Sequence, residues 1–286
     1  MGKLVDKLRE VTQASGGGLG FLSPARGQER KPRPAALLVI GGRDDAATLQ
    51  AAAESGADGV ILSGWTSDGT GFTSLIETLR KRNTIWGVSL EQDYSAGTLK
   101  GAQEQGASFA VLDQSLAARA LFDDVGKLDL VVTVEPPTDE LAMLSLRAVN
   151  LLPVRAALID ARFTSAALTR LSIADFTRLR VIGESLRFPT LVTLRDAPTA
   201  ESTKVLVELG ADALVLSATD ASASAFGKQI GDVIAQLEKT PAQREHEGGA
   251  LLAGLLGGAG QPTDVPGPSP TPRPRPDKPE REPDEE

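Results

Sequence analysis

The sequence predicts an α/β fold, namely a (β/α)8 barrel with an N-terminal helix and a disordered C-terminal tail. Eight short apolar runs alternate with helical patterns, and their starts are mostly 21 to 27 residues apart, with one gap of 34. This alternation is typical of parallel βα units, and eight units closing into a ring is the simplest arrangement. A doubly wound open sheet is the alternative. The runs begin near Leu37, Gly59, Ile85, Ser108, Asp129, Ala156, Thr190 and Ala213.

The chain divides by composition into three parts. Residues 1–33 hold an amphipathic helix and a basic loop, residues 34–240 the barrel, and residues 241–286 a flexible Gly/Leu segment with a Pro-rich acidic tail. The first helix places its apolar residues on one face, so we expect it to plug the bottom of the barrel or dock on its side. The tail holds half of the 18 prolines, a composition that cannot order itself by burying apolar surface.

Helical periodicity fills the spaces between the strands. Threonines stand at the expected starts of the helices that follow the fifth, sixth and seventh strands, and hydroxyl side chains at these positions cap helices. They are Thr138, Thr164 and Thr199. If they are the caps, Glu135, Asp160 and Arg195 remain free for another role. The expected helices are Asp44–Ser55, Thr73–Arg82, Ser95–Gln105, Thr138–Ala148, Thr164–Leu179, Thr199–Leu209 and Ser222–Leu237.

Three segments repeat one pattern, in which a helix ends at glycine and a small residue leads into a strand. Glu54–Ser63, Glu104–Asp113 and Glu208–Ser217 all follow it, and their glycines are placed to take the left-handed conformation that ends a helix. This recurring unit resembles the aldolase-type TIM barrels, which include phosphate-binding and flavin-binding members. The resemblance covers residues 36–238, and it implies the fold rather than one activity.

Polar residues recur at the carboxyl ends of the strands, where barrels of this kind place their active sites. Alternate residues of a strand face the same side, and the helix layer is dry, so the polar set should face the barrel axis. Four consecutive strands then end in a carboxylate and the next in an arginine. The expected top layer is Gly41, Ser63, Glu91, Asp113, Glu135, Asp160, Arg195 and Ser217.

These residue types suggest chemistry on a small anionic metabolite. We expect Glu91, Asp113, Glu135 and Asp160 to act as catalytic acids or bases, and Glu135 and Asp160 to hold Mg²⁺ or Mn²⁺, which prefer oxygen ligands. Arg195 would clamp the anionic group of the substrate, a role that suits its planar, two-pronged guanidinium. Further substrate contacts are expected from Ser63, Ser217 and Thr219.

The barrel sequence lacks the residues that several classes of enzyme reaction require. There is no cysteine, the only histidine is His246 in the tail, and no lysine stands at a strand end, so thiolate, histidine and Schiff-base mechanisms are not expected in the barrel. The turns after the last two strands lack the glycines that phosphate-binding barrels use, so FMN is not expected either. A net charge of −8 argues against a nucleic-acid partner.

Two functions stay open at this level: a lyase or aldolase-like barrel enzyme, and a degenerate, non-catalytic barrel that serves as a binding or scaffold protein. No apolar run is long enough to span a membrane, and a cytoplasmic location is the expectation. The Gly/Leu segment at 248–260 could dock on the barrel or on a second copy, which would give a homo-oligomer. The sequence names no partner for the tail.

Overall fold

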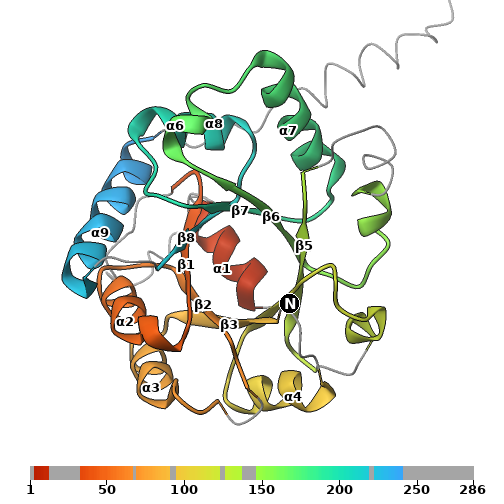
Figure 1. The fold of residues 1–286 in the computed structure, drawn as a ribbon, viewed down its shortest axis with the longest axis vertical. Coiled ribbons are helices and arrows are strands. Elements are labelled where there is room, and N and C mark those ends of the chain that lie inside the picture. Colours follow the sequence, from red (N-terminus) through yellow and green to blue (C-terminus); the bar gives the residue numbers. More distant parts are fainter. Residues whose placement is uncertain are drawn as a thin grey trace, which may run out of the picture. The chain divides into compact units, whose positions relative to one another are not determined.

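The computed structural model describes residues 3–12, 33–66, 69–90, 95–122, 126–136, 146–218 and 222–240. Eight parallel strands close into a barrel in chain order, and β8 pairs with β1 (Figure 1). The predicted barrel is confirmed, and each strand starts within one residue of its expected position. The strands are β1 (Ala36–Gly41), β2 (Gly59–Ser63), β3 (Ile85–Leu90), β4 (Phe109–Leu112), β5 (Asp129–Val134), β6 (Ala156–Phe163), β7 (Thr190–Leu194) and β8 (Ala213–Ser217).

Helices surround most of the barrel, and five of the described ones begin after a serine or threonine whose side chain caps the helix. Thr164 and Thr199 each accept a backbone N–H three residues on, as the sequence predicts. The helix expected over Thr164–Leu179 is two helices, because Ser172 accepts the Asp175 N–H and begins a new one. The helices are α1 (Lys3–Thr12), η1 (Arg43–Asp45), α2 (Ala46–Glu54), α3 (Thr73–Lys81), α4 (Ala96–Glu104), η2 (Ala118–Leu121), α6 (Ser165–Leu168), α7 (Ile173–Ser185), α8 (Ala200–Glu208) and α9 (Ala223–Lys239).

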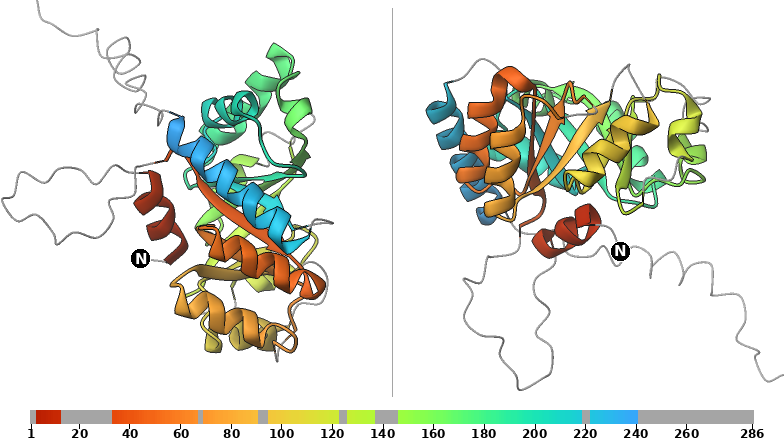
Figure 2. Two further views of the ribbon diagram at one scale, coloured as in Figure 1. Left: turned by 90° about the vertical axis from the view of Figure 1, so that its left-hand side faces the viewer. Right: turned by 90° about the horizontal axis from the view of Figure 1, so that it is seen from below.

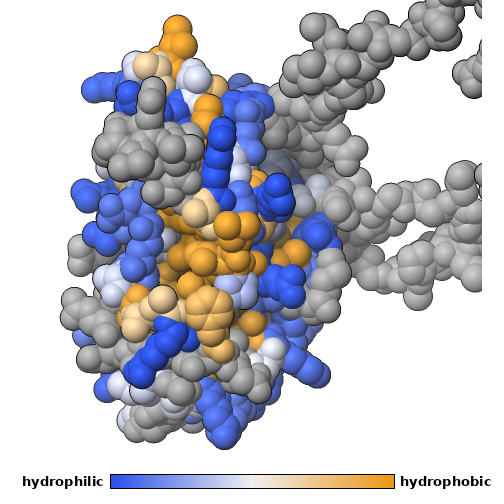
Figure 3. Space-filling model, turned by 90° about the vertical axis from the view of Figure 1, so that its right-hand side faces the viewer, coloured by the Kyte–Doolittle hydropathy of each residue, from blue (hydrophilic) through white to orange (hydrophobic). Residues whose placement is uncertain are grey.

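The described residues beside β4 and β5 form short helical segments. Within its described residues, the link between these strands forms the short η2. A helical turn covers 146–149, while Thr138 and the rest of the helix expected at Thr138–Ala148 lie outside the described residues. Apolar side chains gather on this side of the molecule, as Figure 3 shows, and Phe122, Leu151 and Ile173 are highly exposed.

The helix α1 closes the amino end of the barrel (Figure 2). Leu4, Leu8 and Val11 are buried in the cluster that fills the barrel interior, so the structure shows the plug rather than the side-docked arrangement. The Leu4 N–H donates to Asp129 Oδ2 at 3.0 Å, and the Arg33 N–H donates to the Val11 carbonyl at 2.9 Å. One hydrogen bond therefore joins this helix to β5, and the other joins it to the segment that leads into β1.

Two interior glycines make room for large side chains of neighbouring strands. Phe109 is fully buried inside the barrel, and a Cβ added to Gly87 would lie 2.5 Å from both its ring and its carbonyl oxygen. A Cβ on Gly59 would lie 2.7 Å from Leu38 Cδ2. The ring of Phe109 and the aliphatic side chains thus fill space that neighbouring strands leave empty, and the interior is a packed core rather than a pore.

Buried charges cluster at the same amino end. Arg33 Nη2 donates to Asp58 Oδ1 at 2.6 Å, and Asp58 Oδ2 accepts the Leu37 N–H at 2.8 Å. Burial raises the pKa of Asp129, against the opposing effect of the backbone N–H groups of Leu4 and Val5. Burial likewise raises the pKa of Asp212. These groups hold helix and strand ends in place at the end of the barrel opposite the expected active site.

The predicted loop and tail cannot be compared with the structure. Residues 13–32 and 241–286 lie outside the described residues, and so does His246. Across the helices that the structure does describe, none combines the length and hydrophobicity needed to cross a bilayer.

Candidate functional site

A cavity of about 670 Å³ opens at the carboxyl ends of the strands, and we call it the mouth cavity. All eight strands, or the residues that directly follow them, contribute to its walls. Its volume lies within the range typical of small-molecule sites. The lining residues are Ile40, Gly41, Gly42, Asp45, Ser63, Ser89, Asp113, Ser115, Thr133, Leu158, Asp160, Arg162, Thr193, Leu194, Arg195, Ser217 and Ala218.

The structure brings five of the predicted site residues together in this cavity. They come from five different strands and share the inward-facing position of their strands, because for each of them the residue two or four positions earlier belongs to the interior cluster. Two further predicted residues, Glu91 and Thr219, lie outside the described residues. The five are Ser63, Asp113, Asp160, Arg195 and Ser217.

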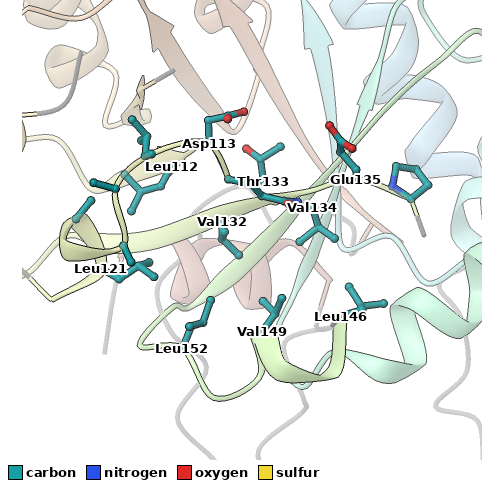
Figure 4. A pocket seen from close by; sticks show the side chains of 16 residues that line it. Leu112, Asp113, Leu121, Val132, Thr133, Val134, Glu135, Leu146, Val149 and Leu152 are labelled. Atoms are coloured by element: carbon teal, nitrogen blue, oxygen red, sulfur yellow. The ribbon is translucent and has the colours of Figure 1, made fainter. Parts of the chain in front are cut away.

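Glu135 follows the same alternation but borders a different hollow. In Figure 4 it lies on the same side of β5 as Thr133, with Asp113 nearby, whereas Val132 and Leu146 lie on the other side. Its neighbour Val134 pairs with Ile159, so Glu135 stands next to Asp160 at the rim. Glu135 lines the hollow beside the mouth cavity rather than the cavity itself.

One member of the expected top layer is wrong. Gly41 faces the helices, because a Cβ there would lie 3.1 Å from Leu49 Cδ2 of α2, and the inward residues of β1 are Ala36, Leu38 and Ile40. Gly42 takes the inward position, where an added Cβ would meet the Ser63 hydroxyl. The strand is apolar on both faces, so no polar residue revealed its alternation in the sequence.

Hydroxyl groups form the floor of the cavity, one layer below the charged residues. Ser89, Thr133 and Thr193 are each only 9% exposed and belong to β3, β5 and β7. Thr193 Oγ1 contacts the Ile159 carbonyl at 3.0 Å and Asp160 Oδ1 at 2.9 Å, which ties β7 to the carboxylate on β6. The floor can therefore donate to or accept from a polar ligand.

Arg162 is a site residue that the sequence did not reveal. The β6–β7 register shifts between Ile159 and Phe163, and Arg162 takes a left-handed backbone with φ of 43°. Its Nε donates to both carboxylate oxygens of Asp160, at 3.2 and 3.1 Å. A β-bulge re-aims side chains in this way, and nothing in the sequence of β6 marks the bulge.

Charges of both signs line the mouth cavity. Arg162 and Arg195 stand at the ends of the adjacent strands β6 and β7, whereas Asp113 follows β4 and Asp45 follows β1. Asp113 Oδ1 accepts the Ser115 N–H at 2.8 Å, and Asp45 Oδ2 accepts the Gly42 N–H at 2.8 Å. A ligand with one anionic end has a cationic arc to bind and carboxylates beside its remaining atoms.

The predicted metal ligands, Glu135 and Asp160, are adjacent, but Asp160 is already paired. Both of its oxygens accept from Arg162, so the carboxylate has a cationic partner without a metal. Within the described ranges, no three or more His, Cys, Asp or Glu side chains are grouped so as to hold an ion. The described side chains fit an arginine more closely than a divalent cation, and the metal site stays a prediction.

An apolar groove of about 500 Å³ adjoins the mouth cavity beside β4 and β5 (Figure 4). Its walls come from the outer faces of β4 and β5, from η2 and from the turn at 146–149. Asp113 and Thr133 line both hollows. The residues that give the groove its apolar character include Leu112, Leu121, Val132, Val134, Leu146, Val149 and Leu152.

The tryptophans are structural. Trp65 is buried, and its ring centroid lies 6.0 Å from that of Phe72 and 5.6 Å from that of Trp86. Trp86 is buried in the helix layer, as its place in the strand alternation predicts. Trp65 therefore packs against other aromatic side chains and does not line the mouth cavity. Tyr94 lies outside the described residues.

Comparison with known proteins supports the fold alone. No protein-family model and no curated protein matches the sequence. Among solved structures, a mutant tryptophan synthase alpha-subunit from Pyrococcus furiosus is similar with a TM-score of 0.57 at 12% identity, over 71% of this chain and 99% of that one. Tryptophan synthase from M. tuberculosis gives 0.56 at 12%, over 72% and 94%.

A thiamine phosphate pyrophosphorylase from Pyrococcus furiosus is similar with a TM-score of 0.51 at 13% identity, over 72% of this chain and 98% of that one. These neighbours are enzymes built on aldolase-like TIM barrels, so the resemblance predicted from the glycine repeats is confirmed for the fold. At such low identity a shared fold does not carry a shared reaction.

Proposed function

We propose that this barrel is a lyase or aldolase-like enzyme that acts on a small anionic metabolite in the mouth cavity. The observation that carries the proposal is that two arginines, on β6 and just after β7, line the same cavity as the carboxylate of Asp113. An anion binds favourably beside guanidinium groups, and a carboxylate within reach of its other end can move a proton.

Each described residue then has a distinct role. Arg195 binds the anionic group of the substrate, and Ser63 and Ser217 contact its oxygens. Asp113 accepts the proton of a substrate hydroxyl while the adjacent carbon–carbon bond breaks, and the electron pair of that bond becomes an enolate. Arginine stabilises the charge that develops beside the bound anionic group. Mg²⁺ or Mn²⁺ at Glu135 and Asp160 would stabilise the same charge, but this proposal does not require an ion.

The anion site can be tested without knowing the substrate. A panel of small carboxylates and inorganic phosphate should raise the melting temperature of the full-length protein, because a ligand that binds only the folded state stabilises it. Arg195→Gln should weaken binding about 10- to 100-fold, the loss expected for a hydrogen-bonded contact to a charged group. Calorimetric titration measures this change.

Arg187→Gln is the matched control, because Arg187 is an exposed arginine just before the amino end of the same strand, β7. It should leave the affinity unchanged. Equal loss in both variants would indicate a general effect of net charge, and no loss in Arg195→Gln would refute the proposed site.

A non-catalytic barrel is the alternative, and the Asp160–Arg162 pair favours it, because that pair leaves fewer unpaired carboxylates for catalysis. The two functions differ in what Asp113→Asn does to a ligand that binds. In an enzyme the variant still binds the ligand but turns it over at least about 100-fold more slowly, the usual effect of losing a general base. In a binding protein even the wild type leaves every bound ligand unchanged.

A further inference from the structure

The backbone of Arg162 is in a conformation that its side chain makes unfavourable. Its φ of 43° lies in the left-handed region, and among the described non-glycine residues only Asn83 shares a positive φ. Asparagine adopts this region comparatively easily, whereas in most other residues the Cβ atom there crowds the following carbonyl oxygen. Glycine would be relaxed at this position, so the arginine side chain is kept at a cost to the fold.

The ion pair of Arg162 with Asp160 does not by itself account for that cost. The Arg162 side chain is 67% exposed, and its ion pair with Asp160 lies at the surface. Exposed ion pairs contribute little to stability because water and salt screen them. This ion pair therefore gives little reason to assign Arg162 a role in fold stability, and its position at the mouth cavity points to a role in binding.

The bulge places Arg162 beside Arg195. Phe163 pairs with Leu194, and the Arg195 N–H donates to the Phe163 carbonyl at 2.9 Å. Arg162 directly precedes this pair on β6 and Arg195 directly follows it on β7, so the two arginines lie diagonally across adjacent strands. Both line the mouth cavity. The two guanidinium groups thus stand on adjacent strands at one side of one hollow.

The orientation of Arg162 is supported from below. Asp160 accepts from its Nε, and Thr193 holds Asp160 Oδ1 at 2.9 Å. The Arg162 N–H also donates to Thr193 Oγ1 at 3.4 Å. The carboxylate that the sequence suggests as a catalytic group or metal ligand thus orients an arginine, which identifies Asp160 as a positioning residue.

We propose that Arg162 and Arg195 together bind one terminal oxyanion of the substrate, a carboxylate or a phosphate, between their guanidinium groups. This inference rests on the proposed function and adds a second binding residue to it. Both anions offer the paired oxygens that a guanidinium binds with two hydrogen bonds. Titration with acetate and with inorganic phosphate, in separate arms, decides which of the two the site prefers.

The test uses four variants of the full-length protein: Arg162→Gly, Arg162→Lys, Arg195→Gln and the control Arg187→Gln. Arg162→Gly should melt at the wild-type temperature or above without ligand, because glycine relaxes the left-handed backbone. Its dissociation constant for the preferred anion should rise at least about tenfold. Arg162→Lys keeps the positive charge but loses the planar guanidinium that donates two parallel hydrogen bonds. Its affinity for the anion should therefore lie between those of the wild type and Arg162→Gly.

The outcomes separate this inference from the proposed function. If Arg195→Gln weakens anion binding and Arg162→Gly does not, the second binding residue is refuted while the anion site stands. If Arg162→Gly lowers the ligand-free melting temperature and leaves the affinity unchanged, the arginine is structural and the inference fails. If neither anion binds the wild type, or if Arg195→Gln binds as tightly as the wild type, the proposed function fails.

Discussion

Asp129 shows how a single buried carboxyl links the plug helix to pH. Burial raises its pKa above the ordinary 3.8, and this effect outweighs the hydrogen bonds from the backbone of α1. A carboxyl whose pKa is higher in the folded state stabilises the fold at low pH. That contribution is lost as pH rises from about 3.8 through the folded-state pKa. The charged form therefore lowers stability at neutral pH.

The substitution Asp129→Asn should remove this dependence. We expect the free energy of unfolding of the wild type to fall relative to that of the variant as pH rises from 3 to 7, and to level off above the folded-state pKa. Urea denaturation of both proteins at several pH values measures the difference. A difference that is constant, or that changes in the opposite direction, would contradict the assigned cause of the raised pKa.

Some residues of the mouth cavity could be predicted from the sequence and others could not. Strand alternation predicted that Asp113, Asp160 and Arg195 face one cavity. One face of each strand packs against the apolar helix layer, so polar residues at the strand ends were expected on the other face, toward the open mouth. Arg162 could not be found, since it faces the cavity only through a bulge that shifts the register. The pairing of Asp160 with Arg162 depends on that bulge and was equally hidden.

Within the strands, the interior glycines cannot accept a side chain, because the large side chains that they face occupy the space a Cβ would need. Gly87→Ala adds a Cβ that would lie 2.5 Å from the Phe109 carbonyl, which a rotamer change cannot relieve. We expect a loss of about 1–3 kcal/mol in the free energy of unfolding, the typical cost of overpacking. Chemical denaturation of the variant and the wild type gives the value.

Gly231→Ala is the control for this substitution. Gly231 lies in α9, where an added Cβ has no neighbour within 4 Å, so the change should be neutral or stabilising. If the two variants lose stability equally, steric crowding in the barrel interior is not the cause.

The strands and most helix starts could be predicted because local chemistry determines them. Gly56, Gly106 and Gly210 all have positive φ, as the repeated glycine unit requires. The division at Ser172 was missed because the helical periodicity continues across it, and a capping hydroxyl there competes with helix continuation. The alternation of β1 was missed because its residues are apolar on both faces.

Across the whole barrel, the two ends have different roles. The amino end is closed by α1 and contains buried carboxylates engaged by backbone groups and by Arg33. The carboxyl end is open, polar and lined by two arginines in a chain of net charge −8. In enzymes of this fold the amino end contributes to stability and the active site lies at the carboxyl end.

The central claim is that an anion binds between β6 and β7 at the mouth of the barrel. A crystal structure of the full-length protein with its preferred anion tests it most directly. The account predicts density for the anion within hydrogen-bonding distance of both Arg162 and Arg195. Density for the anion elsewhere, such as beyond β8 or outside the barrel, would contradict it.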